Sequence, residues 1–328
     1  MKHVLVILGS ILFCLACGFS SAIPPVDPPG LASTFSFGVM GDAPYSSQNE
    51  SEFPYLVDSI NVQSPDFVIH VGDIKDSGTE CSDSLYANRF DALKSIASPL
   101  IYVPGDNEWT DCHREPRNVN DPLERLSALR KVFYPLPGRS LGKNNIPLEI
   151  QAMNPGWSEF VEHQRWQNNN VLFVTIHMVG SLNGLSLFET RTELHDAEVD
   201  RRIGAATAWL RSSFEKARTE NVSAVVIATH ADPWNIDEDD WDGVPPRTGF
   251  EEVLDVLVTE SQDFNKPVLI VNGDSHKFVV DRPLVDSDGA TVTNVTRLVT
   301  YGDEEVGWIE VTVDLENSPR VFSFEGHS

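Results

Sequence analysis

The chain has 328 residues, of which 22% are charged, and its formal net charge is -25 at pH 7. This strong acidity excludes nucleic acids and anionic membrane surfaces as partners held by general electrostatics. An anionic substrate would need local positive charge, such as a metal ion.

Residues 1–22 have the features of a secretory signal peptide: a basic start, an apolar run over 4–19 and small residues at the expected cleavage point. A transmembrane anchor is the alternative, but the run is short for a bilayer span and prolines follow it closely. We therefore expect a secreted protein with no membrane span after signal removal. The length of residues 23–328 suits a single catalytic domain.

Two of the four cysteines lie in the predicted signal peptide, which leaves Cys81 and Cys112. In an oxidising compartment these two are expected to form one disulfide bond, and two free buried thiols are the alternative. Sequons at Asn49, Asn221 and Asn294 fit a glycosylated secretory protein.

An apolar, β-branched run repeatedly ends in a polar loop that begins with Gly-Asp or with His, and each run is typical of a buried strand. The runs cover 35–40, 67–71, 100–103, 224–228 and 268–271. Helical patterns fall between them, at 53–62, 85–96, 123–133 and 195–218. This alternation predicts an α/β fold whose functional loops cluster on one sheet edge.

The end of the chain has a different pattern, with consecutive strands expected at 297–301, 308–313 and 321–324. They predict a second, largely antiparallel sheet packed on the first. An acidic stretch rich in Trp and Pro, residues 232–247, is expected to form a long surface loop near the site.

Ligand-type side chains follow the predicted strands directly. They are Asp42, Asp73, Asp106, His230, Asp274 and His276. A single Gly-Asp pair is more often a structural turn than a metal site. Ligand types that arrive from separate strand ends, however, predict convergence on one spot.

The order of these loops resembles that of calcineurin-like metallophosphoesterases, which use DxH, GD, GNH followed by an acid, a lone His, and GHxH. The similarity spans residues 35 to about 278. Asp42 matches the first-metal Asp, and Asp73 matches the bridging carboxylate. His230 and His276 match the lone His and the last His of GHxH. The resemblance implies a four-layer αββα sandwich of two mixed β-sheets flanked by helices.

The chain also departs from the family pattern. Pro44 stands where the family has a metal-binding His, and proline cannot be a ligand. Asp106 replaces the ligand Asn, Asn107 replaces the adjacent His, and Asp274 replaces a ligand His. The resemblance then implies one metal held by Asp42, Asp73 and His276, and a second held by Asp73, Asp106, His230 and Asp274.

The added carboxylates affect the expected metal and substrate. They bring two divalent ions near charge neutrality, which weakens attraction for phosphate. They favour Mn²⁺ or Mg²⁺, allow Ca²⁺ and disfavour Zn²⁺ and iron. The GD motif also lacks the tyrosine ligand of purple acid phosphatases, which argues against an iron-tyrosinate centre.

Three further residues are candidates for catalysis. Lys75 either contacts the substrate phosphate or pairs with the excess carboxylates, and Asn107 is expected to stabilise phosphate oxygens. His113 is the leading candidate for the general acid that the third loop lacks, and a solvent-exposed loop His is the alternative. A disulfide between Cys81 and Cys112 would tie together the loops that supply Asp73 and Asp106.

The expected function is metal-dependent hydrolysis of small-molecule phosphate esters. A binding protein built on a decayed phosphoesterase site is the main alternative, because Pro44 and Asn107 replace functional residues. A Ca²⁺-stabilised extracellular structural protein is the other, because the ligand set is rich in carboxylates.

Overall fold

The computed structural model describes Met1 and residues 33–114, 119–235 and 248–328. Most of the predicted signal peptide, and residues 236–247 of the predicted surface loop, therefore lie outside the described residues. Ala32–Ser328 form one compact unit. None of the helices described is both long enough and apolar enough to cross a membrane.

Two β-sheets form the centre of this unit. The first contains β1 (Thr34–Met40), β2 (Val68–His70), β3 (Leu100–Tyr102), β11 (Trp308–Asp314) and β12 (Phe322–His327), in the order β12-β11-β1-β2-β3. The second contains β4 (Glu149–Ile150), β5 (Gln164–Asn168), β6 (Val171–Thr175), β7 (Ala224–Ala228), β8 (Val268–Asn272), β9 (Val279–Asp281) and β10 (Val295–Val299), in the order β4-β5-β6-β7-β8-β10-β9. Both sheets are mixed, since each combines parallel and antiparallel pairs.

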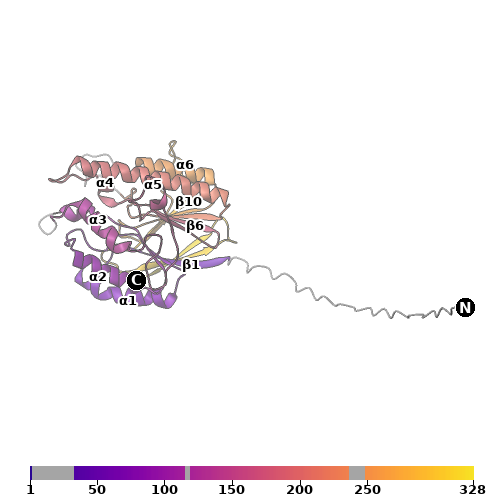
Figure 1. Ribbon diagram of the computed structural model, residues 1–328, viewed down its shortest axis with the longest axis horizontal. Helices are drawn as coiled ribbons and strands as arrows, with labels where there is room; N and C mark the ends of the chain where they lie inside the picture. The colour runs from indigo at the N-terminus through magenta and orange to yellow at the C-terminus, as the bar shows by residue number, and fades with distance from the viewer. Residues whose placement is uncertain (2–32, 115–118, 236–247) are drawn as a thin grey trace. The chain divides into compact units, whose positions relative to one another are not determined.

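Helices cover the outer face of each sheet (Figure 1). Helices α1 (Ser47–Gln63), α2 (Asp83–Lys94) and α3 (Pro122–Phe133) pack on the first sheet through one apolar cluster. Helices α5 (Glu193–Thr219) and α6 (Glu251–Phe264) pack on the second sheet through another. A third cluster fills the space between the sheets. The four-layer αββα arrangement is confirmed.

The strands alternate their side chains between these clusters. In β2, Ile69 faces the other sheet, whereas Val68 faces the helices. In β7, Val226 faces the other sheet and Val225 faces α5 and α6. Because both of its faces are covered, a central strand such as β7 is apolar throughout, as the sequence pattern indicated.

The strands do not divide between the sheets as predicted. The loop-bearing strands belong to both sheets, with β1, β2 and β3 in one and β7 and β8 in the other. At the end of the chain, β10 pairs parallel with β8. Only β11 and β12 extend the first sheet, with β11 antiparallel to β1 and β12 antiparallel to β11. The prediction that the last three strands share one sheet was wrong, because an apolar run shows burial but not its partner.

The asparagines of the predicted glycosylation sequons differ in their surroundings. Asn49 is 5% exposed, and its side-chain oxygen accepts a hydrogen bond from the Ser46 amide in the capping box of α1. The side-chain amide of Asn294 donates to two backbone carbonyls. Asn221 is exposed. Of the predicted glycan sites, only Asn221 thus offers an accessible side chain.

Candidate metal centre

The ligand-type residues from both sheets converge at the carboxyl ends of their strands. Ligand atoms of Asp42, Asp73 and His230 lie within 4.8 Å of one another, and so do those of Asp106, His230 and Asp274. We call these five residues, together with His276, the metal centre. The sequence-predicted ligand set therefore comes together in the fold.

His230 lies between the two groups and is fully buried. Its Nδ1 lies 2.7 Å from the backbone carbonyl of Val71, which can only accept, so Nδ1 carries the proton. The other ring nitrogen, Nε2, therefore faces the carboxylates of the metal centre. Nε2 lies 2.9 Å from Asp106 Oδ1, 3.5 Å from Asp73 Oδ1 and 3.8 Å from Asp274 Oδ1. A metal-ligating imidazole has this orientation.

Asp42 and His276 form the other side of the metal centre. His276 Nε2 lies 3.6 Å from Asp42 Oδ1, which also accepts from the Asp274 amide at 3.0 Å. The second carboxylate oxygen, Oδ2 of Asp42, is buried and has no hydrogen-bond partner among the described residues. An unpaired buried carboxylate oxygen is costly, and a cation would satisfy it.

The backbone at these strand ends adopts an unusual conformation. The φ angles of Asp42, Asp73, Asp274 and His276 are 51°, 55°, 71° and 59°, in the left-handed region that costs non-glycine residues energy. Close packing adds to the constraint, because a Cβ on Gly105 would lie 2.1 Å from Asp73 Oδ1. The Gly of a Gly-Asp motif here makes room for a neighbouring loop's carboxylate.

The protonation of the carboxyls follows from burial. Burial raises the pKa of Asp42 to about 8 and that of Asp274 to about 6, and it raises the pKa of Asp73 well above its usual value. Burial also acts on Asp106, but hydrogen bonds from His230 and Ser181 lower the pKa of this carboxyl. These buried carboxyls and the His230 Nε2 form an oxygen-rich donor set that fits divalent cations.

Glu108 is a positioning residue to which the sequence assigned no role of its own. Its buried Oε1 accepts hydrogen bonds from the amide of Asp73 at 3.1 Å, the amide of Gly105 at 2.6 Å and the hydroxyl of Tyr102 at 2.6 Å. The loops after β2 and β3 are thereby held together through one carboxylate. Its place directly after Gly-Asp-Asn was the available signal, since the family motif also continues with an acid.

Ser181 and Arg114 are also near the metal centre, although the sequence did not single them out. The short α4 (Gly180–Gly184) contains left-handed residues, and it places Ser181 Oγ 3.0 Å from Asp106 Oδ2 and 3.0 Å from Asp111 Oδ1. The guanidinium of Arg114 donates to Ser181 Oγ at 3.1 Å and pairs with Asp111 at 3.0 Å.

An open cleft of about 430 Å³ lies over the metal centre. Its aspartates are Asp73, Asp76, Asp106, Asp111, Asp232, Asp274 and Asp303. Arg114 and His276 are the basic residues among the described ones that line it. The cleft alone therefore attracts cations and repels anions.

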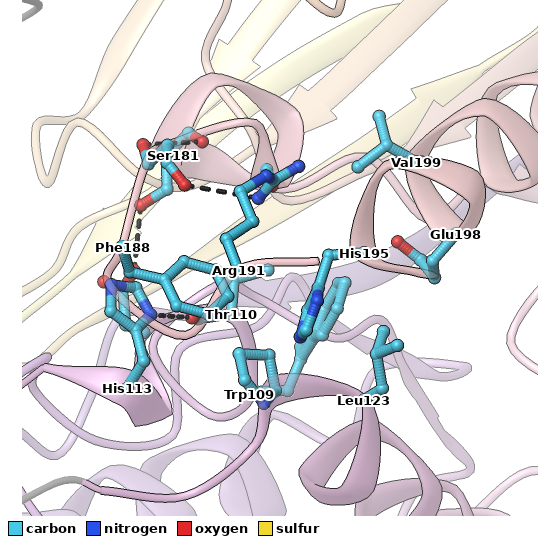
Figure 2. A pocket seen from close by; sticks show the side chains of 14 residues that line it. Trp109, Thr110, His113, Leu123, Ser181, Phe188, Arg191, His195, Glu198 and Val199 are labelled. Atoms are coloured by element: carbon cyan, nitrogen blue, oxygen red, sulfur yellow. Dashed lines mark hydrogen bonds between the residues drawn. The ribbon is translucent and has the colours of Figure 1, made fainter. Parts of the chain in front are cut away.

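The structure places His113 outside this cleft. Its Nδ1 lies 2.6 Å from the Thr110 carbonyl, and its ring stacks on Phe188 with a centroid distance of 4.2 Å. It lines a neighbouring pocket together with Trp109 and His195 (Figure 2). The predicted role of His113 as general acid does not fit this position. The next residue, Arg114, is the one that faces the cleft.

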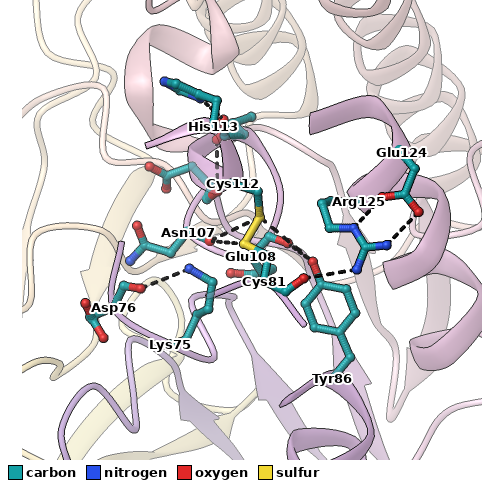
Figure 3. Close-up of a disulfide and its surroundings, with 12 residues drawn as sticks. Lys75, Asp76, Cys81, Tyr86, Asn107, Glu108, Cys112, His113, Glu124 and Arg125 are labelled. Atoms are coloured by element: carbon teal, nitrogen blue, oxygen red, sulfur yellow. Dashed lines mark hydrogen bonds and ion pairs between the residues drawn. A yellow bond between two sulfur atoms is a disulfide. The ribbon is translucent and has the colours of Figure 1, made fainter. Parts of the chain in front are cut away.

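Lys75 and Asn107 occupy different positions. Lys75 is fully buried and does not line the cleft; its Nζ donates to the Asp76 carbonyl at 2.9 Å (Figure 3). Burial lowers the pKa of Lys75, and the charges of Glu108 and Asp73 oppose this effect. Lys75 is therefore placed away from a substrate in the cleft, and its Nζ contacts a backbone carbonyl. Asn107 lines the cleft, and its backbone amide donates to Asp73 Oδ1 at 3.0 Å.

The predicted disulfide between Cys81 and Cys112 is present, with a Cα–Cα distance of 5.8 Å (Figure 3). It joins the segment after β2 to the short helix η1 (Thr110–His113) after β3. The hydroxyl of Tyr86, beside it, donates to the Glu108 carbonyl. The loops that supply Asp73 and Asp106 are therefore linked covalently.

Solved structures with a similar fold include phosphatases. A dimetal phosphatase from Danio rerio superimposes with a TM-score of 0.51 at 13% identity, covering 90% of this chain and 96% of that one. A purple acid phosphatase from yellow lupin (Lupinus luteus) has a TM-score of 0.45 at 10% identity, covering 91% and 54%. GAP50, the anchor in the inner membrane complex of Plasmodium, has a TM-score of 0.45 at 11% identity, covering 90% and 89%.

Sequence comparisons are more specific about the family. No curated protein sequence matches the chain. A model of the calcineurin-like phosphoesterase family, however, matches residues 35–278. This range contains every residue of the metal centre and most of the chain, and the fold agrees with it. The chain belongs to the calcineurin-like phosphoesterase family.

Proposed function

We propose that this protein is a hydrolase of small-molecule phosphate esters that uses two divalent cations in the metal centre. One observation carries the proposal: strand ends from both sheets bring carboxylates and imidazoles within ligand distance of one another beneath an open cleft. Family membership supports the same reaction class.

The chain's own residues position the reactants. When bound, the cations would supply positive charge for the phosphate and an activated water as the nucleophile. Asp73 belongs to the same ligand group as Asp42 and is oriented by the amide of Asn107 and by the carboxylate of Glu108. The half-exposed Arg114 guanidinium is available to a phosphate oxygen at the cleft wall.

The metal centre has no clear candidate for the general acid that would protonate the leaving group among the residues described. Asn107, which replaces the family's imidazole, is neutral, and His113 lies outside the cleft. An ester with an acidic leaving group needs no general acid, so aryl phosphates should react faster than alkyl phosphates. The carboxylate-rich donor set supports Mn²⁺ or Mg²⁺ as the working cation, with Ca²⁺ as a weaker alternative.

Hydrolysis by metal-stripped protein tests the proposal. We expect turnover of p-nitrophenyl phosphate or bis(p-nitrophenyl) phosphate after Mn²⁺ or Mg²⁺ is restored, and none with chelator alone. Asp73→Asn should lower the rate more than about 100-fold, because even residues that only orient metal ligands give losses of that order. Asp91→Asn, an exposed change on α2, is the matched control and should keep full activity. Wild-type protein that binds metal and hydrolyses neither ester would favour a decayed binding protein.

We also propose that the protein is exported. The basic start and apolar run of residues 1–22 support this, as does the disulfide between Cys81 and Cys112. A sequon at the exposed Asn221 is compatible with it. Expression in a eukaryotic secretory host should yield protein in the medium whose N-terminus begins near Ile23. Retention inside the cell with residue 1 intact would contradict export.

A further inference from the structure

The hydroxyl of Tyr45 lies against three residues of the metal centre. Its hydroxyl oxygen lies 2.8 Å from Asp73 Oδ2, 3.3 Å from His276 Nε2 and 3.5 Å from Asp42 Oδ1. The Nδ2 of Asn107 donates to the same oxygen at 3.2 Å. One phenol oxygen thus contacts three residues that the family resemblance assigns to the first metal.

The backbone and ring of Tyr45 hold the hydroxyl in this place. Its amide donates to Asn49 Oδ1 at 3.1 Å, which anchors the residue to the start of α1. Its ring packs edge-on against the His276 ring with a centroid distance of 5.2 Å. The hydroxyl is therefore directed at the metal centre by contacts at both ends of the residue.

The spacing of the donor atoms matches a shared cation. Atoms bound at about 2.1 Å to one octahedral ion are separated by about 3 Å when they are neighbours in the coordination shell. The three contacts of the Tyr45 oxygen, at 2.8, 3.3 and 3.5 Å, have this spacing. The 3.6 Å between His276 Nε2 and Asp42 Oδ1 is slightly longer.

We propose that Tyr45 is a ligand of the first cation, through its phenolate oxygen, in place of the imidazole that Pro44 cannot supply. Binding of the cation displaces the phenol proton to solvent. The inference rests on the proposed function for its choice of site, and it adds a donor that the sequence did not indicate. The GD motif lacks a tyrosine ligand, and the tyrosine proposed here belongs to the first motif instead.

The alternative is that the phenol blocks the first site by donating its proton to Asp73. The two arrangements predict opposite effects of removing the hydroxyl. If Tyr45 is a ligand, Tyr45→Phe weakens or abolishes one metal site. If the phenol blocks the site, the same variant gains a metal ion.

Calorimetric titration of the chelated full-length protein with Mn²⁺ separates these outcomes. We expect two ions per chain for wild type and for the control Tyr55→Phe, a residue that is 74% exposed. Tyr45→Phe should bind one ion, or bind the second at least about 10-fold more weakly. Unchanged stoichiometry and affinity in Tyr45→Phe, or an increase in bound ions, would overturn the inference.

Loading with Fe³⁺ gives a second readout that does not depend on activity. A phenolate bound to Fe³⁺ absorbs visible light by charge transfer, so wild type and Tyr55→Phe should be coloured and Tyr45→Phe colourless. A colour that persists in Tyr45→Phe would count against the ligand assignment.

Esterase assays distinguish the failure of the ligand assignment from the failure of the proposed function. Loss of one ion in Tyr45→Phe upholds the ligand assignment even if wild type hydrolyses no ester. Turnover by wild type upholds the proposed function even if Tyr45→Phe binds metal normally.

Discussion

Asp42 is the most constrained side chain of the metal centre. It is fully buried, its φ angle is 51°, and its Oδ2 has no partner among the described residues. Two glycines pack against it, since a Cβ would lie 2.2 Å from Asp42 Oδ2 at Gly273 and 2.3 Å from Asp42 Cβ at Gly302. The rest of the fold must offset the free-energy cost of this strained, buried carboxyl, and such strain is typical of a functional position.

The stability of the metal-free protein should depend on pH through this residue. Burial raises the pKa of Asp42 from 3.8 to about 8, so the folded state binds more protons than the unfolded chain between these values. The stabilisation from protonated Asp42 is fully present below the pKa of the unfolded chain, and it is lost as the pH rises through the pKa of the folded state. We expect the Tm in chelator to fall by several degrees between about pH 5 and about pH 8.

Scanning calorimetry of Asp42→Asn checks this expectation, because an amide does not titrate. The variant should show a smaller fall in Tm over the same pH range than wild type, whereas Asp91→Asn should follow wild type. An equally steep fall in Asp42→Asn would assign the pH dependence to other groups.

Residue types at strand ends were sufficient to predict which candidate ligands converge in the fold, but not which side chains face them. Asp106 and His230, predicted from separate loops, lie 2.9 Å apart. Tyr45 was missed because its reach depends on the path of the loop after β1. His113 was predicted to face the site, but the next residue, Arg114, lines the cleft instead. Neighbouring side chains in a tight turn point in different directions, and the sequence does not show which of them faces the cleft.

At the level of elements, the apolar patterns predicted the positions of strands and helices better than they predicted which strands pair. The run at 224–228 coincides with β7, and the pattern at 123–133 nearly coincides with α3. Helix α1 begins earlier than expected, at Ser47, because its first turn is polar and is set by the Ser46 cap. Pairing partners depend on contacts distant in sequence, which explains why β10 was assigned to the wrong sheet.

Both sheets supply residues of the metal centre. Asp42, Asp73 and Asp106 follow strands of the first sheet, whereas His230 and Asp274 follow strands of the second. Bound cations would connect the sheets at one edge, where charge otherwise opposes their approach. An unfolded chain does not bring these ligands together, so metal binding should stabilise the native state.

Thermal unfolding with and without Mn²⁺ measures this effect. At a free metal concentration 100 times the dissociation constant, stability should rise by about 2.7 kcal/mol per site, which corresponds to several degrees in Tm. Asp91→Asn should show the same rise as wild type, and Asp73→Asn a much smaller one. A metal-dependent rise of equal size in Asp73→Asn would place the stabilising ion elsewhere.

The acidic cleft has a consequence for the order in which ligands bind. Its aspartates repel a phosphate ester until cations neutralise them, so metal binding raises the affinity for the anion. Thermodynamic linkage requires the reverse to hold by the same factor. A phosphate ion in the cleft must therefore hold the cations more tightly, and scarce metal is retained best by the protein molecules that have substrate or product bound.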